Sequence, residues 1–152
     1  MSIQDLLKNN HLELISISVT DSRLKHDRAL RNFNFYQKTK FNPGDEDVVY
    51  KGLYDSLLIA CQSFLLLNGY RVKSSIKGHH LIIITATELL MPGEITNEFK
   101  RMKMMRSKRN EFEYGNPTTI STVELNQAIS DIGVLLRKID QLIAGQESRL
   151  PI

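Results

Sequence analysis

The sequence predicts an all-α protein, an up-and-down bundle of four long helices plus one or two short helices. Apolar residues recur with helical spacing over several long segments. Turn-forming stretches separate these segments and read NPGDED, NGYRVKSSIKGHH, MPGE and YGNPTTIST. No linker is long enough to divide the chain, so we expect a single helical domain over residues 1–152.

The first long helix is predicted over residues 17–41, ISVTDSRLKHDRALRNFNFYQKTKF. One side of this helix carries Val19, His26, Leu30, Phe33 and Gln37. His26 lies on that apolar stripe, so we expect it to be a core histidine. The next segment, residues 46–69, is apolar over most of its circumference, as a central bundle helix should be, and Asn68-Gly69 ends it.

Residues 79–91, HHLIIITATELLM, are ambiguous because a β-branched run also suits a strand. A helix is favoured, since no second strand is evident to pair with it. Residues 93–114 and 121–145 supply the remaining long helices. The last one begins with a capping box, Ser121 followed three residues later by Glu124. Its near-heptad seam consists of Ile129, Ile132, Leu136, Ile139 and Ile143.

Composition favours an intracellular globular protein, with 41% hydrophobic and 24% charged residues. The single cysteine, Cys61, lies in an apolar run and is expected to be a buried small hydrophobe. One cysteine excludes an intrachain disulfide framework and suits the reducing cytoplasm. The apolar runs are too short to span a bilayer, and the N-terminus lacks the layout of a secretory signal. We therefore expect a cytoplasmic protein without membrane association.

Positive charge is concentrated in the third long helix, residues 93–114. Six cations and no acid occupy ten residues, namely Lys100, Arg101, Lys103, Arg106, Lys108 and Arg109. At 100° per residue, the apolar face of Ile95, Phe99 and Met102 continues into Arg106, Arg109, Asn110 and Glu113, with Tyr114 at its edge. Unpaired charge is costly to bury, so this face must meet water, a partner or its own counter-ions. A solvated helix end with an Arg109–Glu113 pair remains the simpler alternative.

The order of several short motifs resembles the HEPN superfamily of small helical bundles, from Val48 to Ala144. The resemblance rests on LYDSLLIACQSFLLLNGYRVKSSIKGHH followed by an amphipathic helix and RNEFEYGN. It comprises a central helix with a tyrosine followed by small residues, a Gly-Tyr-Arg turn, a Gly-His-His helix start, and Arg-Asn followed by acid-Tyr-Gly. The resemblance implies a helical homodimer that acts on RNA in a toxin–antitoxin or defence setting, with RNA and an antitoxin protein as partners.

Many members of that superfamily resemble metal-independent endoribonucleases that carry Arg, a polar residue and then His. Arg109 and Asn110 match the first two positions, whereas the His is absent and Glu113-Tyr114 match the branch ending in acid-Tyr. The predicted catalytic residues are therefore Arg109, Glu113 and Tyr114. The predicted RNA-binding residues are Lys103, Arg106, Lys108, Arg109 and Asn110.

Adjacent His79 and His80 diverge by about 100° on a helix and make a poor metal site, so we expect neither a metal nor a cofactor. By the resemblance, one of the two provides the missing imidazole from a different helix; capping and packing are the alternative. Among Met102, Met104 and Met105, at least Met104 is expected to be exposed, where a dimer seam would cover it. The competing hypothesis is a catalytically inactive interaction module that binds a protein partner.

Overall fold

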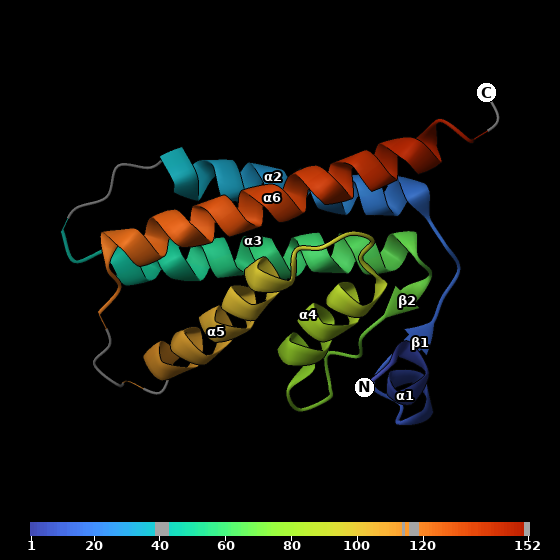
Figure 1. Ribbon diagram of the computed structural model, residues 1–152, viewed down its shortest axis with the longest axis horizontal. Helices are drawn as coiled ribbons and strands as arrows, with labels where there is room; N and C mark the ends of the chain where they lie inside the picture. The colour runs from blue at the N-terminus through green and yellow to red at the C-terminus, as the bar shows by residue number, and fades with distance from the viewer. Residues whose placement is uncertain (39–42, 114, 116–118, 151–152) are drawn as a thin grey trace.

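The computed structural model describes residues 1–38, 43–113, 115 and 119–150, without the side chains of residues 112 and 113. Their helices are α1 (Ile3–Lys8), α2 (Val19–Lys38), α3 (Glu46–Leu67), α4 (His79–Leu90), α5 (Thr96–Glu113) and α6 (Thr122–Glu147). The four long helices α2, α3, α5 and α6 reverse direction from one to the next (Figure 1). The predicted all-α bundle is therefore confirmed, with α1 and α4 as the short helices.

The ambiguous apolar run is a helix, α4, as predicted. It begins after Gly78, whose φ of 76° lies in the left-handed region that glycine tolerates best. The predicted capping box of α6 is also present: the Ser121 hydroxyl accepts a hydrogen bond from the Glu124 amide, and Glu124 accepts one from the Ser121 amide. A left-handed glycine thus marks the start of α4, and a capping box marks the start of α6.

Helix α3 occupies the centre of the molecule and contacts α2, α4, α5 and α6 (Figure 1). Leu53, Tyr54, Leu57 and Cys61 have no solvent exposure. The predicted central helix and the predicted burial of Cys61 are both confirmed. Because the helix is apolar around most of its circumference, it can bury surface against every neighbour at once.

The predicted inner face of α2 is partly wrong. Leu30 is 39% exposed and Gln37 is also exposed. The buried residues are Ser22, His26, Ala29 and Phe33. Small residues on this face let α2 approach α3 closely, and the Ser22 hydroxyl donates to the Ser63 carbonyl at 2.7 Å. His26 is a core histidine, as predicted, with Nε2 2.9 Å from the Leu136 carbonyl oxygen.

A two-stranded antiparallel sheet, β1 (Glu13–Leu14) with β2 (Tyr70–Arg71), joins the N-terminal segment to the end of α3. An Arg71–Glu13 ion pair of 2.7 Å accompanies it. Two residues per strand are too few for an alternating pattern, so the sequence gives no sign of this sheet. Within the described ranges, no helix combines the length and apolarity needed to cross a bilayer.

Candidate functional site

Helix α5 changes character along one face, as predicted. Ile95, Phe99 and Met102 are buried, at 8%, 1% and 0% exposure. Two turns later Arg106, Arg109 and Asn110 are only half-buried. Met105 is buried too, whereas Met104 is 63% exposed, as expected. The apolar half of this face anchors α5 in the bundle, and the charged half projects from its C-terminal part.

The Arg109 guanidinium lies over the ring of Tyr54, with 5.8 Å between its carbon and the ring centroid. This is cation–π geometry. Tyr54 comes from the middle of α3 and has no solvent exposure. Burial raises the pKa of Tyr54 well above its ordinary value, although Arg109 and Arg106 act in the opposite direction. The phenol therefore stays protonated and is available only as a neutral hydroxyl.

The Tyr54 hydroxyl oxygen is buried and makes no hydrogen bond to any residue that the structure describes. Buried polar groups almost always have a partner, because an unpartnered one costs about 1–3 kcal/mol. A hydroxyl in this state, beside two arginines, marks a place where an additional polar group would be stabilised.

His80 completes the cluster from the first turn of α4. Its ring centroid lies 5.8 Å from that of Tyr54 and 4.4 Å from that of His79, edge to face. Burial, His79, Arg109 and Arg106 lower the pKa of His80 to about 4. His80 is therefore neutral at physiological pH. His79 is held against the backbone, with Nδ1 3.2 Å from the Ile76 carbonyl oxygen.

These contacts define what we call the Tyr54 cluster, made of Tyr54, His80, Arg106 and Arg109. The structure thus brings His80 to the predicted arginines, on the helix that the sequence hypothesis named. Among the described residues, no carboxylate forms an ion pair with Arg106. The cluster combines two guanidinium groups, a neutral imidazole and a phenol, and its net charge is positive.

Three further cations of α5 have partners within the chain. Lys103 binds Glu88 of α4 at 2.6 Å, and Lys108 binds Glu124 of α6. Arg101 makes two hydrogen bonds to the buried carboxylate of Asp131, 2.7 and 2.8 Å long. The predicted RNA contacts of Lys103 and Lys108 would therefore have to compete with carboxylates. Among the described residues, Arg106 forms no ion pair with a carboxylate, and Arg109 lies over the ring of Tyr54.

Two predicted catalytic residues fall at the edge of the described chain. Helix α5 ends at Glu113, whose side chain is outside the described set, as is the whole of Tyr114. Their roles, and the Arg109–Glu113 pair, stay predictions. The described residues contain no group of three or more His, Cys, Asp or Glu side chains placed to hold a metal ion.

Tyr54 is the member of the cluster that sequence reasoning missed. In the sequence it is the tyrosine of the LYDSLL motif in the resemblance, to which no role at the site was assigned, and a polar-tipped aromatic residue in an apolar helix usually serves packing. Searches with this chain against protein-family models, curated proteins and solved structures gave no match.

Proposed function

We propose that the Tyr54 cluster binds an RNA phosphodiester and cleaves it without a metal ion. One observation carries the proposal: His80 and Arg109 meet at the same tyrosine, although they come from different helices. The HEPN resemblance supports it, because the imidazole missing from the Arg109 motif is supplied here from α4. The proposed protein is a cytoplasmic HEPN-like ribonuclease of toxin–antitoxin or defence type, acting as a homodimer.

The chemistry follows from the groups in the cluster. Arg106 and Arg109 hold the nonbridging phosphate oxygens, since a guanidinium matches them with two parallel donors. Neutral His80 takes the proton of the 2′-hydroxyl as its oxygen attacks phosphorus. The new phosphorus–O2′ bond replaces the phosphorus–O5′ bond, and the departing oxygen takes a proton from solvent. The products are a 2′,3′-cyclic phosphate and a 5′-hydroxyl, and the arginines stabilise the charge that develops between.

Phosphate binding also makes His80 a better base. Burial, His79 and the two arginines lower its pKa in the free protein. A phosphate between the arginines offsets their charge and removes their share of this lowering, so the His80 pKa rises when RNA is bound. The Tyr54 hydroxyl, which has no partner among the described residues, donates to a phosphate oxygen.

The test is cleavage of unstructured RNA in EDTA by the parent protein and by His80→Gln and Arg109→Ala. We expect cleavage by the parent, loss by at least about 100-fold in each variant, and a cyclic phosphate end. Arg137→Ala, an exposed arginine of α6, is the matched control and should cleave normally. Thermal melts accompany the assay. Removing Arg109 should cost about 1–2 kcal/mol of stability, because a cation–π contact is worth about 0.5–1 kcal/mol when exposed and about 2 kcal/mol when desolvated, and this contact is partly buried.

A second candidate function, the inactive interaction module, is favoured by the internal pairing of Lys103, Lys108 and Arg101. In that case the α5 cations are structural and bind no phosphate. Absence of cleavage and of RNA binding in the parent, with large stability losses in Arg109→Ala, would establish it over the ribonuclease.

A further inference from the structure

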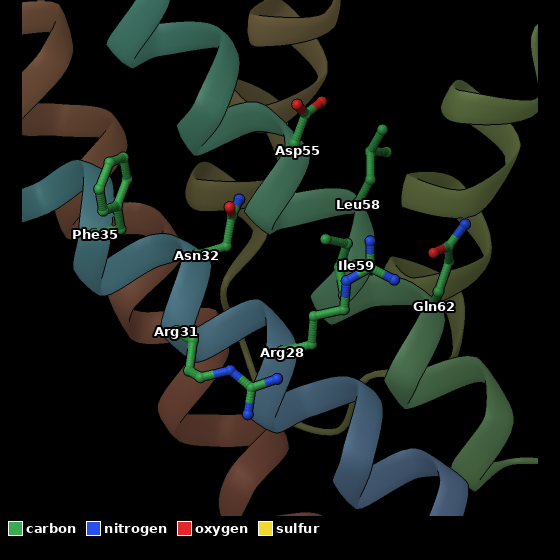
Figure 2. Close-up of a pocket in the computed structure, with 8 residues that line it drawn as sticks. All are labelled: Arg28, Arg31, Asn32, Phe35, Asp55, Leu58, Ile59 and Gln62. Atoms are coloured by element: carbon green, nitrogen blue, oxygen red, sulfur yellow. The ribbon is translucent and has the colours of Figure 1, made fainter.

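A groove of about 580 Å³ lies between α2 and α3, and none of the four residues of the Tyr54 cluster lines it (Figure 2). Helix α2 contributes Arg28, Arg31 and Phe35, and α3 contributes Asp55, Ile59 and Gln62. Figure 2 shows Arg28 extending from α2 toward Ile59, with Arg31 beside it on the same helix. The groove therefore has two guanidinium groups on the α2 wall, and an apolar side chain, a carboxylate and an amide on the α3 wall.

Positive charge dominates the α2 wall. Arg28 and Arg31 are exposed and three residues apart, so they share one face of the helix. One turn earlier, burial and the nearby Arg28 lower the pKa of Lys25. The α2 carboxylate of Asp27 lies 4.0 Å from Arg23, which also pairs with Asp140 and Glu147 of α6. The α2 wall thus presents Arg28 and Arg31 to the groove, and the Asp55 carboxylate lies on the α3 wall.

The exposed aromatic ring of Phe35 lies between two cations of α2. Phe35 is 63% exposed, with Arg31 one turn before it and Lys38 one turn after it. A second hollow, lined by Arg31, Phe35 and Lys38, continues the groove past the ring. Tyr36 packs edge to face on Phe35, with 5.1 Å between centroids, and supports one side of it. Cations alternating with a ring are what single-stranded nucleic acid binds, through phosphates and stacked bases.

The groove and the Tyr54 cluster share helix α3. Asp55, which lines the groove, follows Tyr54 in α3 and is one of the charges that act on the Tyr54 hydroxyl. The two sites therefore use residues within about one turn of the same helix. A carboxylate-rich peptide would satisfy the arginines but offers no flat ring to cover Phe35. A nucleotide supplies both groups in each repeating unit.

We propose that the α2–α3 groove is a second binding site for single-stranded RNA, which holds the nucleotides flanking the scissile phosphate. Arg28 and Arg31 bind phosphates, and a base stacks on Phe35. This inference rests on the proposed function for the identity of the ligand. It assigns the groove a role in affinity and in the length of RNA required, and no role in the chemical step.

The test is titration of a fluorescent 2′-O-methyl oligoadenylate, which lacks the attacking hydroxyl and cannot be cleaved. Phe35→Ala should weaken binding roughly tenfold, through loss of stacking. The double variant Arg28→Ala/Arg31→Ala should reduce the slope of log affinity against log salt by about 1.4, at about 0.7 for each single-strand phosphate contact. The charge-matched control Arg137→Ala/Arg149→Ala removes two exposed arginines elsewhere and should bind like the parent.

Groove variants that bind like the control overturn the inference, and cleavage of unmodified RNA by the parent then leaves the proposed function standing. If the groove variants lose affinity and His80→Gln cleaves as well as the parent, the groove inference stands. The proposed chemistry at the Tyr54 cluster is then wrong. Polyglutamate is the competing ligand. If it binds the groove and the oligonucleotide does not, the site takes an acidic protein and the inference fails.

Discussion

His80 is surrounded by positive charge although it carries none itself at neutral pH. Its pKa is about 4 in the folded chain, against an ordinary value of 6.5, because of burial and the neighbouring His79, Arg109 and Arg106. Between these two values the unfolded chain binds the additional proton and the folded chain does not. The free energy of unfolding therefore falls as pH is lowered through this window.

We expect His80→Gln to flatten the dependence of stability on pH between about 4.5 and 6.5. Glu124 and Glu147 are stabilised by Lys108 and Arg23, which lower their pKa values below the ordinary 4.5, so their contributions are lost at lower pH. Urea unfolding across this range measures the effect. An unchanged slope in the variant would show that His80 does not carry the linkage.

The Tyr54 cluster shows what sequence can and cannot supply about this site. One face of α5 changes from apolar at Met102 to charged at Arg106 and Arg109. This change follows from helical geometry alone, because all three residues lie on the same helix. The approach of His80 depends on how α4 packs against α3, and a single sequence does not determine such crossings. Here the family resemblance supplied the expectation. The resemblance includes Tyr54 as the tyrosine of the central helix, but no role at the site was predicted for it, because its pattern is that of a core residue.

Helices α2 and α3 meet closely at Gly52. A Cβ at this position would lie 2.3 Å from ring atoms of Tyr36, far inside contact distance. The Asn32 amide bridges the same junction, donating to the Gly52 carbonyl oxygen at 3.2 Å and to Ser56 Oγ at 2.8 Å. The absence of a side chain at Gly52 therefore sets how near the two helices come.

Gly52→Ala should destabilise the fold by about 1–2 kcal/mol, because displacement of Tyr36 outweighs the gain in helix propensity. The matched control is Gly145→Ala in α6, where a new Cβ meets nothing within 4 Å. It should stabilise by about 0.5–1 kcal/mol. Introducing Gly52→Ala into a Tyr36→Ala background should remove the penalty. If both glycine variants behave alike in thermal unfolding, the close contact has no energetic weight.

The helices themselves were predictable because their signals are local: periodicity, capping residues and glycine or proline at their ends. The side of α2 that faces inward was less so. Its buried residues include Ser22 and Ala29. A prediction from hydrophobic periodicity does not select such small residues and selects Leu30 instead. Close helix packing selects for size, which a polarity pattern does not record. The sequence pattern does not predict the β1–β2 pairing, because each strand has only two residues.

Homodimerisation, which the resemblance implies, stays a prediction. Met104 is 63% exposed and lines a groove of about 230 Å³ between α5 and α6, on the helix that carries Arg106 and Arg109. Light scattering should return the mass of two chains for the parent and of one chain for Met104→Asp, since a buried carboxylate is costly at an interface. Leu24→Asp, on an equally exposed position of α2, should remain dimeric. A monomeric parent at high concentration contradicts the prediction.

The rate at which a thiol reagent labels Cys61 measures how often the helices around α3 separate. The Cys61 sulfur is the only thiol of the chain and has no solvent exposure, and burial raises its pKa to about 12. A thiol reagent reaches it only while the surrounding helices have separated. In the regime where closing is faster than labelling, the labelling rate gives the free energy of that opening in plain buffer, without denaturant. RNA that binds only the folded chain would slow this labelling. The native thiol therefore reports ligand occupancy without an introduced cysteine.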